Sequence, residues 1–203
     1  MRSLLLAVLL FACAAARSQS SFTLESVKSY PFPTELTSSS QGSRIAWALN
    51  EVGKRNVYVA EGPDFQPRKL TDYTEDDGQE ITSLSISADG KWVVFVRGGD
   101  HGANWDDTLP VNPSFTSQPS KVQLISIPFA GGEEKTLAEG DEPALSPHSD
   151  IVAFVKGGQA HGVPIDGSTP AKSLFTTRGS VGSLEWSPDG SKLTFIASRD
   201  DHA

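Results

Sequence analysis

Apolar and polar residues alternate along most of this chain, and clusters of Gly, Pro, Asp and Ser interrupt the alternation. A period of two places successive side chains on opposite faces of an extended strand, so the pattern predicts β-strands with one face made to be buried. Residues 55–60, 122–128 and 183–186 are β-prone runs of this kind. Beyond the N-terminus, no long window shows helical periodicity. The sequence therefore predicts an all-β fold.

One pattern recurs four times: a turn that begins with serine, followed by an alternating strand that ends on an aromatic residue. The copies align without gaps and cover residues 39–47, 87–95, 146–154 and 187–195. In the second copy, Asp89 and Gly90 supply the local hydrogen bonds and the positive φ that a tight turn needs. A turn-plus-strand unit that returns every roughly 40 to 60 residues is typical of a β-propeller.

Each repeat fits part of a four-stranded blade: a strand before the turn, a strand after it and a polar outer hairpin. Residues 58–71, 127–137 and 163–176 match that outer hairpin. Blades of roughly 40 to 50 residues allow about four in this chain, so we expect an incomplete ring over residues 17–203. The final repeat stops in mid-blade, and we expect the chain to be the N-terminal piece of a longer protein. An antiparallel sandwich with similar hairpins is the alternative.

Residues 1–16 have a different character. Arg2 provides a short positive region, residues 4–11 are apolar but too few to span a bilayer, and residues 14–16 are three alanines. This order is typical of a secretory signal peptide with a small-residue cleavage site. We therefore expect an exported protein, periplasmic or extracellular, without a membrane span.

Cys13 is a candidate lipid anchor, because residues 10–13 resemble a bacterial lipoprotein box. The large Phe11 and the short segment before Cys13 argue against lipidation. Cleavage after Ala16 would remove the cysteine together with the signal peptide. The mature chain would then contain no cysteine and no disulfide.

Charge and motif content exclude several functions. The formal charge is −8 and no basic run is present, which argues against a nucleic-acid partner or an anionic membrane surface. The chain lacks a Gly-x-Ser-x-Gly elbow and any His or Cys pair with metal-ligand spacing. We therefore predict no catalytic residue, no cofactor and no metal ion within this chain. Residues 75–77 lack the spacing of a calcium loop, and they and Glu133-Glu134 are expected to be solvated charges.

Residues 98–120 form the main irregularity, because they make the second repeat about ten residues longer than its neighbours. Insertions of this kind emerge on one face of a propeller, which is often the binding face. The candidate ligand contacts are Trp105 as an apolar platform with Asp100, His101 and Asp106 as polar partners. The alternative is a solvated loop between two blades, pinned by Trp105.

Residues 184–195, which read Leu-Glu-Trp-Ser-Pro-Asp-Gly-Ser-Lys-Leu-Thr-Phe, are very similar to the Trp-Ser-Pro-Asp-Gly repeat of TolB-like propellers. Such propellers also form the N-terminal domain of exported peptidases of the prolyl oligopeptidase and dipeptidyl peptidase IV superfamily. The signal peptide, the opening segment 22–25, the blade segment 59–71 and the insertion that begins at 96–100 favour the peptidases. The resemblance covers most of residues 22–203.

This resemblance implies a propeller placed over a C-terminal α/β-hydrolase domain beyond residue 203, where it limits access of short peptides to a Ser-Asp-His triad. None of the triad maps onto this chain. The substrate-binding glutamates of the dipeptidyl peptidases are not transferred to Glu133-Glu134, which lack the aromatic and helical surroundings of that motif.

Two other classes of function remain as alternatives. One is a stand-alone periplasmic propeller of the TolB type that binds a protein partner on its loop face. The other is a propeller hydrolase with chemistry in its own channel. That hydrolase would need inward-facing carboxylates or histidines, which the sequence does not reveal.

Overall fold

The computed structural model describes residues 23–98 and 121–198. The chain divides into two units, Met1–Tyr30 and Pro31–Ala203. In the first unit, helix α2 (Leu24–Lys28) begins after Thr23, whose hydroxyl accepts a hydrogen bond from the Ser26 N–H at 3.1 Å. Within the described ranges, no helix has the length and apolar character needed to cross a membrane.

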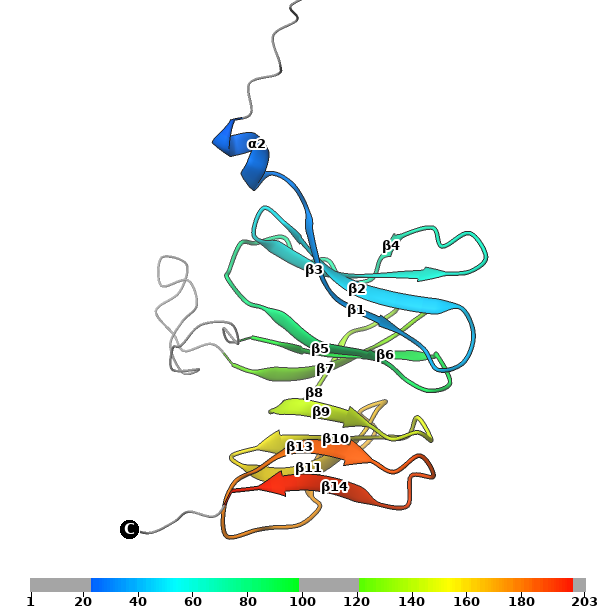
Figure 1. The fold of residues 1–203 in the computed structure, drawn as a ribbon, viewed down its shortest axis with the longest axis vertical. Helices are drawn as coiled ribbons and strands as arrows, with labels where there is room; N and C mark the ends of the chain where they lie inside the picture. Colours follow the sequence, from blue (N-terminus) through cyan, green and yellow to red (C-terminus); the bar gives the residue numbers. More distant parts are fainter. Residues whose placement is uncertain (1–22, 99–120, 199–203) are drawn as a thin grey trace, which may run out of the picture. The chain divides into compact units, whose positions relative to one another are not determined.

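The second unit consists of antiparallel sheets that follow one another along the chain (Figure 1). Blade 1 contains β1 (Phe32–Ser38), β2 (Arg44–Glu51), β3 (Lys54–Glu61) and β4 (Arg68–Lys69). Blade 2 contains β5 (Ile81–Ile86), β6 (Trp92–Arg97), β7 (Gln123–Pro128) and β8 (Lys135–Glu139). Blade 3 contains β9 (Asp141–Leu145), β10 (Ile151–Lys156), β11 (Gln159–Pro164) and β12 (Lys172–Ser173). The described part of blade 4 contains β13 (Val181–Trp186) and β14 (Leu193–Ala197).

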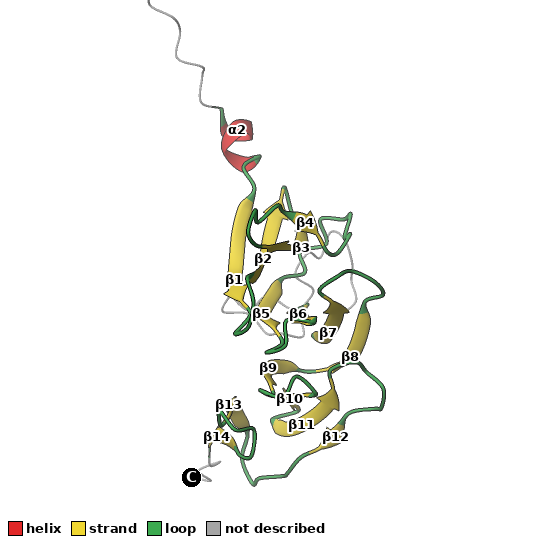
Figure 2. Cartoon of the chain, turned by 90° about the vertical axis from the view of Figure 1, so that its right-hand side faces the viewer, coloured by secondary structure: helices red, strands yellow, loops and turns green. Residues whose placement is uncertain are grey.

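This architecture confirms the predicted all-β fold of four-stranded blades in an incomplete propeller. Strand order follows chain order in every sheet, and loops join strands that are neighbours in the sheet (Figure 2). Each sequence repeat spans the turn between the first and second strand of a blade and most of that second strand.

The serine of each repeat closes its turn. Its N–H donates to the carbonyl five residues ahead in all four repeats, at 3.0 Å for Ser39, 2.9 Å for Ser87, 2.9 Å for Ser146 and 2.8 Å for Ser187. In blade 2, the carboxylate of Asp89 accepts from the Ser87 hydroxyl at 2.7 Å and from the Lys91 N–H at 3.0 Å. Gly90 follows with a φ of 73°, which glycine adopts without strain. Asp189 and Gly190 repeat this arrangement in blade 4.

These hydrogen bonds make two turns sensitive to acid. Burial works to raise the pKa of Asp89, but the hydrogen bonds from Ser87 and Lys91 outweigh it and lower the pKa to about 2. The Ser187 hydroxyl and the Ser191 N–H lower the pKa of Asp189 to about 2 as well. A carboxyl group whose pKa is depressed by folding stabilises the fold above its unfolded pKa and loses that contribution as the pH falls through its folded pKa.

We therefore expect stability to fall as the pH drops from the ordinary Asp value of 3.8 to about 2. The double variant Asp89→Asn, Asp189→Asn should be less stable than the wild type at neutral pH and should lose less stability over that acid interval. Urea unfolding followed by circular dichroism at a series of pH values measures both effects. An identical pH dependence in the two proteins would contradict the assignment.

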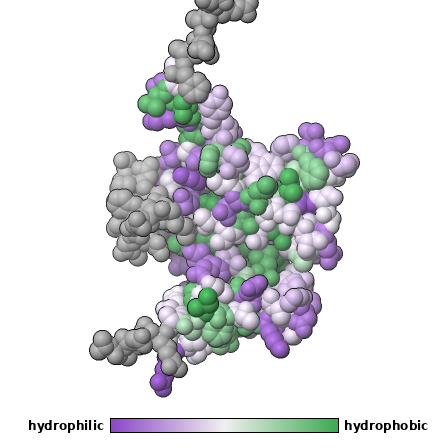
Figure 3. Space-filling view, viewed as in Figure 1, coloured by the Kyte–Doolittle hydropathy of each residue, from purple (hydrophilic) through white to green (hydrophobic). Residues whose placement is uncertain are grey.

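The core lies between the blades. In β6, Val93 and Phe95 belong to the cluster shared with blade 1, whereas Val94 and Val96 belong to the cluster shared with blade 3. All four side chains are 0% exposed. Successive residues of a strand point to opposite faces, so one continuous apolar run fills two interblade cores. The predicted burial of the face with Val93 and Phe95 is therefore confirmed, and the structure buries the other face of β6 as well. In Figure 3, hydrophobic residues gather in the middle of the blades and hydrophilic residues at their right-hand edge.

Antiparallel pairing places the connections at two opposite ends of the blades. We call the end with the repeat turns, residues 39–43, 87–91, 146–150 and 187–192, the turn face, and the opposite end the insertion face. Residues 98–122 connect β6 to β7, which pair directly with each other. The long segment is thus a connection within blade 2 and not a loop between two blades, which corrects one sequence-based interpretation. Its described ends, Gly98 and Lys121, lie at the insertion face, as do the β2–β3 turn and the interblade loop 70–80.

Candidate functional site

The sequence-predicted ligand contacts, Asp100, His101, Trp105 and Asp106, lie outside the described residues. The structure does describe both ends of the segment that holds them. Gly98 donates its N–H to the Glu80 carbonyl at 3.1 Å. Its φ is 119°, and a Cβ at this position would lie 2.1 Å from the carbonyl oxygen of Lys121. Only glycine fits this close approach, so Gly98 and Lys121, the described ends of the segment, lie side by side at the insertion face.

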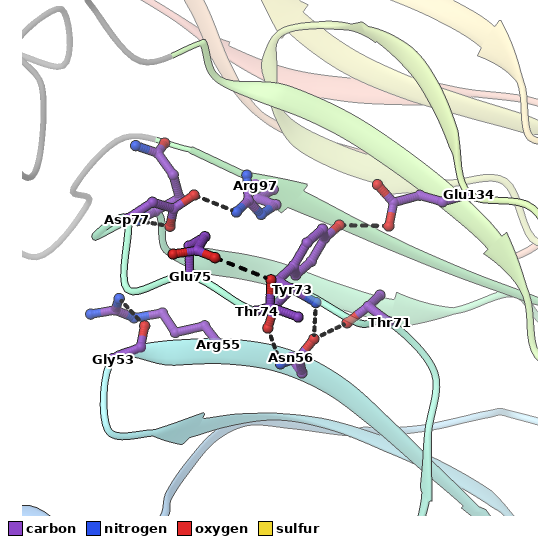
Figure 4. Close-up of polar contacts among 11 residues, drawn as sticks. Gly53, Arg55, Asn56, Thr71, Tyr73, Thr74, Glu75, Asp77, Arg97 and Glu134 are labelled. Atoms are coloured by element: carbon purple, nitrogen blue, oxygen red, sulfur yellow. Dashed lines mark hydrogen bonds and ion pairs between the residues drawn. The ribbon is translucent and has the colours of Figure 1, made fainter. Parts of the chain in front are cut away.

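A polar cluster lies beside that point and fixes the loop 70–80 to blade 1 (Figure 4). Asn56 of β3 is 1% exposed. Its side-chain oxygen accepts from the Tyr73 N–H at 2.7 Å and from the Thr71 hydroxyl at 3.0 Å, and its amide donates to the Tyr73 carbonyl at 3.0 Å. The Asn56 side chain thus satisfies the backbone N–H and carbonyl of Tyr73, which no described strand pairs.

The same cluster connects the loop to blade 2. The guanidinium of Arg97 donates to the Asp77 carboxylate at 2.7 Å and lies 4.1 Å from the centroid of the Tyr73 ring. The side chains of Arg97 and Asp77 are only 20% and 18% exposed, so water screens this pair weakly. Asp77 was expected to be a solvated charge, and the structure corrects this.

Tyr73 extends the cluster to the β7–β8 hairpin. Its hydroxyl donates to the Glu134 carboxylate at 2.6 Å (Figure 4). Burial, and then the hydrogen bond to Glu134, raise the pKa of Tyr73 well above its ordinary value, so the phenol stays protonated and remains a donor. Glu134, expected only to keep a hairpin tip soluble, therefore links two blades.

The first strand of every blade carries a second repeated device, which sequence reasoning missed. Each has a non-glycine residue at positive φ four positions before the turn serine, namely Glu35 (57°), Ser83 (54°), Glu142 (50°) and Ser183 (53°). The strand pairing shifts register around each of them, as in a β-bulge. The signal in the sequence was the spacing of Glu35 and Glu142 from Ser39 and Ser146.

The two glutamates connect neighbouring blades. The carboxylate of Glu35 accepts from the Leu84 N–H of blade 2 at 3.2 Å, and that of Glu142 accepts from the Ser183 N–H of blade 4 at 2.7 Å. Single carboxylates therefore lie on the first strands of blades 1 and 3. Each carboxylate accepts a backbone N–H from the first strand of the next blade, at or beside the bulge residue of that strand. The two glutamates therefore position neighbouring blades.

Two charged side chains at the insertion face are paired with each other. Within residues 23–98 and 121–198, no group of three or more His, Cys, Asp or Glu side chains is arranged to hold a metal ion. Arg97 and Asp77, whose side chains are 20% and 18% exposed, form an ion pair at 2.7 Å. Their arrangement holds blades 1 and 2 together at the base of the long connection.

Comparison with protein-family models gives no match, and comparison with curated protein sequences gives none either. Solved structures do match. TolB from Acinetobacter baumannii has a TM-score of 0.57 at 17% identity, over 84% of this chain and 39% of that protein. A prolyl endopeptidase has a TM-score of 0.57 at 14% identity, over 83% of this chain and 26% of that one. The tricorn protease has a TM-score of 0.56 at 10% identity, over 82% of this chain and 15% of that protease.

At these identities the likeness shows the fold. The blades are those of a β-propeller similar to TolB and to the propeller domains of prolyl endopeptidase and tricorn protease, which confirms the resemblance seen in the sequence. The chain spans well under half the length of each of these proteins.

Proposed function

We propose that this chain is the non-catalytic propeller portion of an exported serine peptidase of the prolyl oligopeptidase superfamily, in which it limits peptide access to a hydrolase domain beyond residue 203. The observation that carries the proposal is a run of consecutive propeller blades whose fold is shared with prolyl endopeptidase and tricorn protease. The signal-like residues 1–16 and the segments 59–71 and 96–100 support the same assignment.

In this function the chain contributes shape and not chemistry. An access filter must keep its blades at fixed spacing, because its opening depends on where neighbouring blades sit. Glu35 and Glu142 hold the first strands of adjacent blades, and the Arg97–Asp77 pair holds blades 1 and 2 at the insertion face. Peptide substrate would be the partner of the whole protein, and the 203-residue chain alone should be inactive.

The test uses the protein encoded by the complete reading frame. A serine-directed fluorophosphonate probe should label it, and it should cleave proline-containing dipeptide substrates. The chain ending at Ala203 is the matched control, and it should show neither labelling nor cleavage. A full-length product that reacts with neither reagent would overturn the proposal.

A stand-alone scaffold of the TolB type is the second candidate, because TolB has the same TM-score as the prolyl endopeptidase. This function predicts a reading frame that ends after the remaining blades, with no fluorophosphonate labelling. It also predicts a stable complex with another exported protein after cross-linking in cells. These readouts separate the two candidates in one preparation.

A further inference from the structure

A pocket of about 260 Å³ lies between blades 1 and 2. Its walls come from the first strands of both blades and from the β2–β3 hairpin, and the residues used below are Phe32, Glu35, Asn50 and Arg55. Both blades are four-stranded and follow each other along the chain. The volume suits a small metabolite.

One wall of the pocket is polar because the β2–β3 hairpin of blade 1 is longer than the equivalent β10–β11 hairpin of blade 3. β2 and β3 have 8 residues each, whereas β10 and β11 of blade 3 have 6. Counted from the turn serines, Leu49 of blade 1 corresponds to Lys156 of blade 3, and the blade 3 hairpin turns immediately afterwards. In blade 1 the ladder continues through the pairs Asn50↔Arg55 and Glu51↔Lys54. The extension brings a guanidinium and an amide to the pocket.

Arg55 differs from the other arginines of blades 1 and 2 that form ion pairs. Arg44 bonds the Glu61 carboxylate at 2.8 Å and Arg97 bonds Asp77 at 2.7 Å. The half-buried Arg55 donates instead to a neutral acceptor, the backbone carbonyl of Gly53, at 3.3 Å (Figure 4). A guanidinium has five N–H donors in a planar fork that matches a carboxylate. Asn50 accepts from the Gly53 N–H at 2.8 Å, which leaves its NH₂ group as a further donor.

The first strand of blade 1 supplies an acceptor. The carboxylate of Glu35 takes the Leu84 N–H on one oxygen and has a second oxygen. Phe32, 66% exposed, adds an apolar surface.

We propose that this pocket binds a small carboxylic acid that carries a hydrogen-bond donor next to its carboxylate, that is, a 2-amino or 2-hydroxy acid. The carboxylate binds Arg55 and Asn50, and the neighbouring ammonium or hydroxyl group donates to Glu35. A ligand with both groups matches the opposite charges of the two walls, which neither a simple anion nor a simple cation can do. The site is independent of peptidase activity.

The experiment is a ligand-observed NMR titration of the full-length protein with probes that share one carbon skeleton. L-alanine and L-lactate carry both groups, propionate lacks the donor, and L-alaninamide lacks the carboxylate. For whichever of L-alanine and L-lactate binds more tightly, we expect a dissociation constant on the order of 1 mM, because so small a ligand offers few contacts. Which of the two binds more tightly identifies the donor as ammonium or hydroxyl. Propionate and L-alaninamide should each bind at least about 10-fold more weakly.

Variants locate the site. Arg55→Gln should weaken binding of the preferred probe at least about 10-fold, as expected for losing a charge-assisted hydrogen bond. Lys54→Gln is the matched control, since it removes the same charge from the adjacent exposed position of β3 and should leave affinity unchanged. The probe series needs no variant, so it remains decisive if Arg55→Gln fails to fold. No binding up to tens of millimolar, equal binding of all probes, or equal effects of the two variants would overturn the proposal.

Discussion

Phe154→Ala will lower the free energy of unfolding by about 3 to 5 kcal/mol, the range for deleting a fully buried phenylalanine ring. The ring is 0% exposed in the core between blades 2 and 3, where it shares a cluster with Val94, Val96 and Leu124. Gly140 makes room for it, because a Cβ at that position would lie 2.5 Å from the ring carbon Cδ2. The surrounding strands are held by their ladders, so the cavity cannot collapse fully.

Urea unfolding monitored by circular dichroism measures this change. Phe32→Ala is the control, because Phe32 is 66% exposed and its loss should change stability by less than about 0.5 kcal/mol. Similar losses in the two variants would show that the interblade core does not dominate stability.

Asn56→Leu will cost about 3 kcal/mol, because it leaves several buried polar groups without partners. The N–H and carbonyl of Tyr73 and the hydroxyl of Thr71 all bond the Asn56 side chain. Leucine has a similar volume but can neither donate nor accept. The loop 70–80 should also detach, so its amide hydrogens should exchange faster than those of β3.

Hydrogen exchange read by mass spectrometry, together with urea unfolding, tests both parts. Thr82→Val is the matched control, because the Thr82 hydroxyl has no partner among the described residues and its removal should cost about 0.5 kcal/mol or less. If Asn56→Leu were as mild as Thr82→Val, the side-chain bridge would not be holding the loop.

The sequence by itself determined the features that depend on near neighbours along the chain. The repeat turn closes through bonds among residues that lie within a few positions, such as Ser87, Asp89 and Trp92. The alternation of side chains fixes where strands run, and the spacing of the turns predicted the blades. These features could be read without knowing which strands would pair, because their hydrogen bonds and φ angles are local.

Only the tertiary structure decided what each face of a strand contacts and which charges meet. β6 is buried on both faces because blades pack against both, which no pattern within residues 92–97 specifies. Tyr73 and Glu134 are 61 positions apart, and Arg97 is 20 positions from Asp77. In sequence these charges look solvated, because a side chain's partner depends on how the blades stack. The pocket beside Arg55 needs two extra hairpin pairs in blade 1 and the bulged strands of two blades, so it emerges only when the blades come together.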